Sequence, residues 1–258
     1  MNILFVGDVV GQRSAEFLAG AMPSLKRRFS VGMTIVNGEN SADGNGITPF
    51  SSDILLRSAD VITTGNHCFR RREMNERFEE NSSVLRPANF GDTVGRGYTV
   101  FDLGRTSVAV VNLIGMAYME GCNNPFLCAD EILREIDTKN IIVDFHAEST
   151  SEKKAMGYYL AGRVSAVIGT HTHVQTADEQ ILEGHTGFIT DVGFTGVRDS
   201  VLGVDKNVII SRLTTYYPQK HTYPDGDIMI NAVVITIDEK SGKCTAIKRV
   251  GIFRDADL

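Results

Sequence analysis

The chain has 258 residues, of which 42% are hydrophobic and 22% charged, and its formal net charge is −6. This length can bury a substantial core, and the composition excludes a disordered or low-complexity protein. The acidic balance argues against a general nucleic-acid-binding surface, which normally carries a basic stripe. An anionic substrate would therefore need local positive charge.

The start of the chain, MNILFVGDVVGQ, has no basic segment and already contains Asp8. No apolar run approaches the ~18–20 residues that span a bilayer, so we expect no signal peptide, no membrane segment and a cytoplasmic location. The four cysteines form no C-x-x-C pair. This spacing disfavours zinc-ribbon and thioredoxin-like sites, and it predicts reduced, buried thiols.

Short β-branched runs alternate with amphipathic segments in the first 80 residues, which predicts a β-α-β arrangement. Thr48 followed by Pro49 is a helix-start signal, because proline at the first helical position lacks only an N–H that would be unbonded there. Strands are expected at 2–7, 33–38 and 60–65, and helices at 14–29, 48–59 and 71–80.

Adjacent strands become more frequent from about residue 98, without a linker or a repeat. The chain therefore predicts one α/β domain over residues 1–258, with a large mixed sheet or two packed sheets. The expected strands are 98–104, 106–115, 140–145, 165–170, 187–193, 229–238 and 244–253, and the expected helices are 126–137 and 150–163.

Polar side chains that can titrate or bind metal follow five of these strands. Ligands of open α/β sheets bind beyond the carboxyl ends of the strands, so we expect these side chains to converge. His185 and His221 lack this setting and are expected to be ordinary surface or core residues. The candidates are Asp8, Glu39, Asn40, Asn66, His67, His146, His171 and His173.

The chemistry of these candidates indicates metal binding. Imidazole nitrogens with carboxylate and amide oxygens suit zinc, iron and manganese. The ligands outnumber those of one tetrahedral ion, whereas two ions about 3.5–4 Å apart would use them all, as in phosphatases and nucleases. The spacing of His171 and His173 leaves one question open, because alternate residues of an extended segment point to opposite sides unless the chain turns.

Five motifs resemble those of the calcineurin-like metallophosphoesterases: GD at 7–8, GEN at 38–40, GNH at 65–67, DFHAE at 144–148 and GTHTH at 169–173. The segments NGEN, RPANF, NPF, VDFHAEST and TDVGFTGVRDSVLG are similar to the YmdB-like phosphodiesterase branch. The resemblance runs from residue 1 to about 205, and we expect it to continue to the end of the chain. One departure is Cys68, which follows the motif histidine where threonine is more usual.

This resemblance implies a four-layer α/β/β/α sandwich of two mixed sheets. It also implies two metal ions per chain, with iron expected and manganese or zinc as alternatives, and it makes Glu39 the bridging ligand and His67 the general acid. By the same resemblance, Asp8, Glu39, Asn40 and His173 would hold one ion, and Glu39, Asn66, His146 and His171 the other.

The function implied by the resemblance is hydrolysis of cyclic nucleotides, 2′,3′-cyclic and also 3′,5′-cyclic monophosphates, by a metal-bridging hydroxide. Phosphomonoester hydrolysis at the same site stays open. One alternative is a metal-holding regulator or RNA-processing partner with little turnover, and another is a dinuclear amidase, although such sites usually carry more carboxylates. The sequence leaves the physiological substrate, the metal and the oligomeric state open, a homo-oligomer included.

Overall fold

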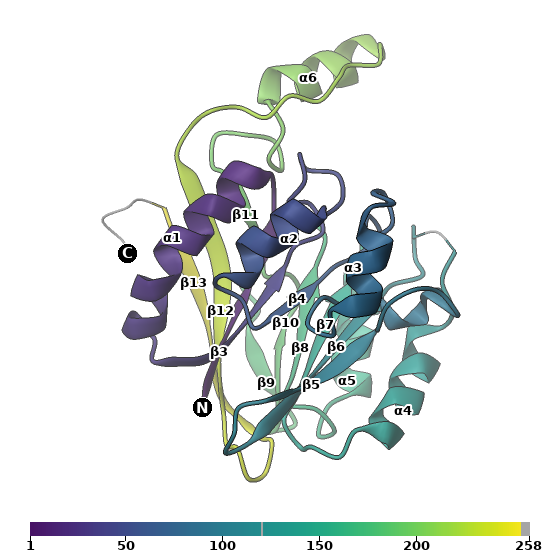
Figure 1. The fold of residues 1–258 in the computed structure, drawn as a ribbon, viewed down its shortest axis with the longest axis vertical. Coiled ribbons are helices and arrows are strands. Elements are labelled where there is room, and N and C mark those ends of the chain that lie inside the picture. The colour runs from purple at the N-terminus through teal and green to yellow at the C-terminus, as the bar shows by residue number, and fades with distance from the viewer. Residues whose placement is uncertain (120, 254–258) are drawn as a thin grey trace.

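The computed structural model describes residues 1–119 and 121–253. The predicted domain of residues 1–258 thus includes position 120 and positions 254–258, which lie outside the described residues. Figure 1 shows two β-sheets facing each other with helices on their outer sides. The helices beside the first sheet are α1 (Gln12–Arg28), α2 (Pro49–Leu56) and α3 (Met74–Glu80), and those beside the second are α4 (Pro125–Glu135) and α5 (Thr150–Tyr159).

The first sheet has the strand order β2-β11-β12-β1-β3-β4, and β13 pairs with β12. Strand β1 runs parallel to β3 and antiparallel to β12, so the sheet is mixed. Its strands are β1 (Asn2–Val6), β2 (Asp8–Val9), β3 (Val31–Asn37), β4 (Val61–Thr63), β11 (Phe194–Val197), β12 (Ile228–Ile237) and β13 (Cys244–Ile252).

The second sheet has the order β5-β6-β7-β8-β10-β9. Strands β6, β7, β8 and β10 are parallel, while β5 and β9 pair antiparallel at the two edges. The sheet is therefore also mixed, as predicted. Its strands are β5 (Tyr98–Asp102), β6 (Ser107–Ile114), β7 (Ile141–His146), β8 (Ala166–Thr170), β9 (Gln180–Leu182) and β10 (Thr186–Ile189).

Three apolar clusters fill the spaces between the four layers. The side chains of strand β1 contribute to two of these clusters. Ile3 and Phe5 join the cluster between the sheets, whereas Leu4 and Val6 join the cluster under α1, α2 and α3. Successive side chains of a strand point to opposite faces, so β1 is apolar throughout because both its faces are buried. A third cluster packs the second sheet against α4 and α5. The predicted α/β/β/α sandwich is confirmed.

Helix α2 begins where the sequence predicts. The Thr48 side chain accepts a hydrogen bond from the backbone N–H of Ser51, and the Ser51 side chain accepts one from the Thr48 N–H. Pro49 occupies the first helical turn. This reciprocal capping box satisfies N–H groups that have no partner within the helix.

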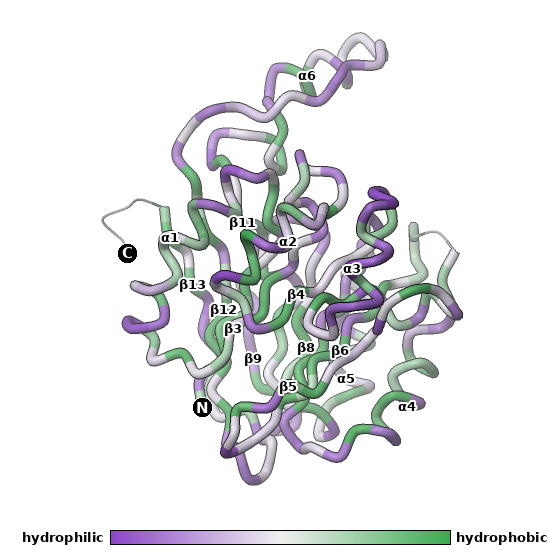
Figure 2. Tube along the Cα trace, in the orientation of Figure 1, coloured by the Kyte–Doolittle hydropathy of each residue, from purple (hydrophilic) through white to green (hydrophobic). Residues whose placement is uncertain are grey.

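Apolar residues are concentrated in the strands and on the inner sides of the helices (Figure 2). The exception is α6 (Lys206–Thr215), which has no buried residue and projects from the body of the molecule (Figure 1). No helix in the described part of the chain is both long enough and apolar enough to cross a membrane.

Candidate metal centre

The predicted site residues lie at the carboxyl ends of five strands, three from the first sheet and two from the second. Strands β1, β3 and β4 lead into Asp8, the Glu39-Asn40 pair and the Asn66-His67 pair. His146 is the last residue of β7, and His171 follows β8 directly. Because the two sheets face each other, these strand ends meet, and the structure brings all eight candidates together.

One tight group of side chains surrounds Nε2 of His146. This nitrogen lies 3.1 Å from Oε1 of Glu39, 3.1 Å from Oδ1 of Asn66 and 3.1 Å from Nδ1 of His171. Ligand atoms of Glu39, His146 and His171 all lie within 4.8 Å of one another. Metal bonds of about 2.1 Å at right angles place neighbouring ligand atoms roughly 3.0 Å apart, so this spacing fits a metal ion.

A second group adjoins the first through Glu39. Nε2 of His173 lies 3.7 Å from Oδ1 of Asp8 and 3.3 Å from Nδ2 of Asn40, and Asn40 Nδ2 also donates a hydrogen bond of 3.1 Å to Oε1 of Glu39. The nitrogen of the Asn40 amide therefore faces this group. A ligand role for Asn40 requires a half-turn of the amide, which brings its oxygen to that side.

Two observations indicate that a cation fits here. Oδ1 of Asp8 is buried with no hydrogen-bond partner among the described residues, although an unpaired buried carboxylate oxygen is costly. At position 65, a Cβ would lie 2.3 Å from Oε2 of Glu39 and 2.3 Å from Nε2 of His146. Only glycine lets these ligand atoms approach the turn after β4.

The turn after β8 answers the question raised by the two histidines one residue apart. The backbone φ angles are 100° at His171 and 61° at His173, in the left-handed region that side-chain-bearing residues rarely adopt. The chain thus turns, and both imidazoles face the candidate metal centre, His171 in the group around His146 and His173 in the adjoining group. Thr172 between them donates its N–H and hydroxyl to Oδ2 of Asp191, which pairs with the buried Lys153 ammonium at 2.6 Å. These contacts hold the strained turn in place.

The buried carboxylates stay ionised and favour positive charge. Burial opposes ionisation of Asp8, but the nearby His173 imidazole and the charge of His146 outweigh it and lower the pKa of Asp8. Glu39 is likewise buried, and the charge of His146 lowers its pKa. Burial alone would lower the pKa of His146, yet the charge and hydrogen bond of Glu39 raise it to about 9. The field at this point therefore attracts cations.

A hydrogen-bonded chain behind His146 fixes its ring. The Thr170 hydroxyl donates to Oδ1 of Asp144 at 2.7 Å and lies 2.8 Å from Nδ1 of His146, so it accepts the Nδ1–H. The other Asp144 oxygen accepts from the Asn37 amide at 3.1 Å and from the Thr63 hydroxyl. This arrangement leaves Nε2 of His146 free to bind metal, and such outer contacts tune metal affinity.

His171 has a comparable support from Glu148. Oε2 of Glu148 lies 3.0 Å from Nε2 of His171, so Nδ1 of that ring faces His146. No role for Asp144, Glu148 or Thr170 was predicted from the sequence. Asp144 and Glu148 lie in the DFHAE motif and Thr170 in GTHTH, but their partners become visible only when the strands are assembled.

His67 lies at the rim, with 28% of its side chain exposed. Its backbone N–H donates to Oε2 of Glu39 at 3.1 Å, and Nδ1 lies 3.0 Å from Oδ1 of Asn40. Burial lowers the pKa of the imidazole. The contact with Asn40 fixes the ring through Nδ1, which leaves Nε2 available to a bound molecule.

Cys68 is fully buried in the apolar cluster under α1, α2 and α3, and burial raises its thiol pKa. We predict that Cys68→Thr keeps metal content and changes kcat/KM less than tenfold, or under about 1.4 kcal/mol of barrier. Urea unfolding should show a loss of about 1–3 kcal/mol because a hydroxyl enters an apolar cluster. Cys244→Thr, at a buried cysteine in the cluster between the sheets, is the matched control. A collapse of activity with metal retained would show that the Cys68 thiol takes part in the chemistry.

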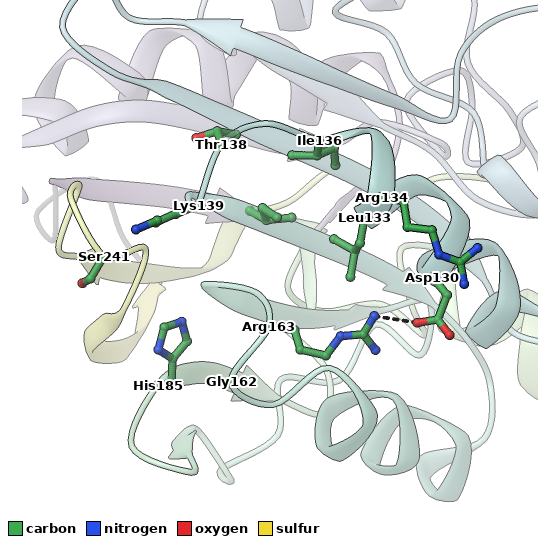
Figure 3. Close-up of a pocket in the computed structure, with 11 residues that line it drawn as sticks. Asp130, Leu133, Arg134, Ile136, Thr138, Lys139, Gly162, Arg163, His185 and Ser241 are labelled. Atoms are coloured by element: carbon green, nitrogen blue, oxygen red, sulfur yellow. Dashed lines mark hydrogen bonds and ion pairs between the residues drawn. The ribbon is translucent and has the colours of Figure 1, made fainter.

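A hollow of about 720 Å³ is lined by none of these candidates. Figure 3 shows its lining, with the Arg163–Asp130 ion pair of 2.6 Å facing Lys139 and His185 across the hollow. Lys139, Arg163 and His185 each precede a strand of the second sheet. The hollow therefore lies at the amino ends of these strands, the opposite edge from the candidate metal centre.

The chain is similar to known proteins over nearly its whole length. It is 44% identical over 259 residues to the 2′,3′-cyclic-nucleotide 2′-phosphodiesterase of Bacillus subtilis (strain 168), covering 99% of this chain and 98% of that protein. A crystal structure of a hypothetical protein from Thermus thermophilus has a TM-score of 0.91 at 33% identity, covering 98% of this chain and 99% of that one.

A crystal structure of a novel phosphatase from Mycoplasma pneumoniae also has a TM-score of 0.91, at 28% identity, covering 98% of this chain and 93% of that one. Residues 4–250 match the family described as YmdB-like protein. The matched segment includes every candidate residue of the metal centre. The chain therefore belongs to the YmdB-like family, which confirms the resemblance predicted from its motifs.

Proposed function

We propose that this protein is a metal-dependent phosphodiesterase that hydrolyses 2′,3′-cyclic nucleotides at a two-ion centre. The observation that carries the proposal is the position of Glu39, whose Oε1 lies 3.1 Å from both His146 Nε2 and Asn40 Nδ2 and so faces both groups of ligand residues. The Bacillus subtilis relative, named a 2′,3′-cyclic-nucleotide 2′-phosphodiesterase, supports this substrate class. The proposal extends to 3′,5′-cyclic monophosphates.

Seven side chains would hold the ions, for which we propose iron, with manganese and zinc as alternatives. Bound ions would polarise the phosphate and acidify the attacking water. Asn40 and Asn66 are neutral, so only Asp8 and Glu39 bring negative charge, which leaves the centre attractive to a phosphate. The proposed ligands are Asp8, Glu39, Asn40 and His173 for one ion, and Glu39, Asn66, His146 and His171 for the other.

His67 is the proposed general acid. When water attacks phosphorus, the bond from phosphorus to the ribose 2′ oxygen breaks, and that oxygen leaves with the electron pair. A proton from Nε2 of His67 neutralises it. Asn40 contacts Nδ1 of His67, and with its amide turned for metal binding the amide nitrogen would donate to Nδ1, which orients the ring and keeps the proton on Nε2. Proton transfer by a positioned side chain typically contributes about 10²–10⁴-fold.

Metal removal and a substrate panel test the proposed function. Protein loaded with iron or manganese should hydrolyse 2′,3′-cyclic nucleotides, and it should cleave bis-p-nitrophenyl phosphate faster than p-nitrophenyl phosphate. A chelator should abolish both activities, and added metal should restore them. Faster cleavage of the monoester would instead indicate a phosphatase, and activity indifferent to chelation would contradict a metal centre.

The hydrogen bond between Thr170 and His146 allows a second test of the proposed metal centre. Thr170→Val removes the hydroxyl that accepts the His146 Nδ1–H while keeping the side-chain shape. We expect metal affinity, measured by titration calorimetry, to fall about 10–100-fold, as for other outer contacts of metal-binding histidines. Thr170→Ser keeps the hydroxyl and should keep the affinity. Equal affinity in the valine and serine variants would show that this contact does not support metal binding.

A further inference from the structure

A second hollow adjoins the metal centre. Its volume is about 400 Å³, within the range of roughly 300–1,000 Å³ for small-molecule sites. Asn66 lines it, and Oδ1 of Asn66 lies 3.1 Å from Nε2 of His146. The hollow and the metal centre therefore share Asn66 as a wall. The lining residues of the hollow are Asn66, Phe69, Arg70, Phe90, Tyr118 and Met119.

Two phenylalanines form an apolar floor. The ring centroids of Phe69 and Phe90 lie 5.8 Å apart at an interplanar angle of 57°, and Phe69 also meets Phe78 edge to face at 5.7 Å. Both lining rings pack against the apolar cluster under α1, α2 and α3. The floor is thus held by the core.

Tyr118 stands at the rim, in the loop between β6 and α4. The residue is 89% exposed, and its φ of 63° lies in the left-handed region. The two residues before it are nevertheless held in place, because the carboxylate of Glu152 accepts hydrogen bonds from the N–H groups of Met116 at 2.8 Å and Ala117 at 3.2 Å. Tyr118 therefore follows an anchored segment and presents an open aromatic face beside the metal centre.

Arg70 supplies the charge of this hollow. It is the one ionisable cation among the six lining residues, and none of them is acidic. Within the described residues, its guanidinium has no ion pair and no hydrogen bond in the structure. In a protein of net charge −6, such a cation gives local attraction for an anionic ligand.

We propose that this hollow is the nucleobase subsite, an assignment that rests on the proposed function and specifies where its substrate binds. The phosphodiester lies at the metal centre, the base stacks on Tyr118 above the phenylalanine floor, and Arg70 faces the phosphate. Every base has a stacking face, so stacking tolerates all four bases. Purines, with the larger face, should bind better than pyrimidines, with little discrimination between adenine and guanine.

The test compares 2′,3′-cyclic AMP with the base-free ribose 2′,3′-cyclic phosphate on metal-loaded protein. The wild type should prefer the nucleotide in kcat/KM. Tyr118→Ala should reduce this preference about tenfold, as expected from the loss of base–aromatic stacking, whereas Tyr118→Phe should keep it. Tyr216→Ala is the matched control, because Tyr216 is 90% exposed with a φ of 60° but lies at the end of α6. It should leave the preference unchanged.

Binding gives a readout independent of turnover. Calorimetry on manganese-loaded protein should show that Tyr118→Ala weakens adenosine 3′-monophosphate about tenfold more than it weakens inorganic phosphate. Arg70→Gln should weaken both ligands to a similar extent, since its charge serves the phosphate.

The outcomes separate the two proposals. Equal kcat/KM for the nucleotide and the base-free compound in the wild type, or a preference that survives Tyr118→Ala, would overturn the subsite and leave the phosphodiesterase intact. No hydrolysis of either compound by metal-loaded protein would refute the proposed function and the subsite with it.

Discussion

Replacement of Glu39 should remove both metal ions and reduce kcat/KM for 2′,3′-cyclic AMP at least about 10³-fold, or roughly 4 kcal/mol of barrier. Its Oε1 faces both ligand groups, at 3.1 Å from His146 Nε2 and from Asn40 Nδ2. Without this carboxylate, each ion loses a ligand, and the repulsion between the two cations is no longer offset.

Two variants keep this prediction falsifiable if one fails to fold. Glu39→Ala removes the side chain, whereas Glu39→Gln keeps its size and removes the charge. Glu79→Gln, at an exposed position of α3, is the control and should bind metal like the wild type. Metal content by plasma mass spectrometry, with circular dichroism as the check of folding, gives the result. Two ions retained by a folded Glu39→Gln protein would exclude the bridging role.

His67→Ala should keep both metal ions and slow 2′,3′-cyclic AMP hydrolysis about 10²–10⁴-fold. In the proposed assignment, this side chain donates a proton and holds no metal. The loss should depend on the leaving group. A ribose oxygen needs protonation as it departs, whereas nitrophenolate is a stable anion, so hydrolysis of bis-p-nitrophenyl phosphate should change far less.

His185→Ala is the matched control, because His185 lines the hollow at the opposite edge of the second sheet. It should alter neither substrate nor metal content. If His67→Ala loses a metal ion, His67 is a ligand. If it slows both substrates equally, His67 positions the substrate and is not the acid.

The layers of the fold could be predicted because the strands carry their own signal. The alternation of Ile3, Leu4, Phe5 and Val6 shows a strand buried on both faces, and the Thr48-Pro49 pair marks the start of α2. Helix α6 was not predicted. Its residues have no buried face, so the sequence lacks the apolar periodicity by which a packed helix is recognised.

The candidate site could be predicted as a set of strand ends but not as a geometry. Alternation along an extended segment could not decide whether His171 and His173 face the same way. The left-handed turn that brings them together depends on Asp191, which binds Thr172 from a distant segment.

The residues around the candidate ligands are harder still to predict from sequence. Asp144 lies inside a buried strand and resembles a structural polar residue until Thr170 and Asn37 are seen to hydrogen-bond to it. Tyr118 has no sequence signal either, because an exposed tyrosine in a loop becomes a candidate for binding only beside a hollow that adjoins the metal centre.

Stepwise metal loading tests the two-ion phosphodiesterase most directly. Metal-free protein is titrated with manganese, and the rate of 2′,3′-cyclic AMP hydrolysis is measured at each ratio of metal to chain. We predict that the rate rises until two ions are bound per chain and then stays constant. A maximal rate at one ion per chain would contradict the two-ion centre, and two bound ions without turnover would contradict the phosphodiesterase.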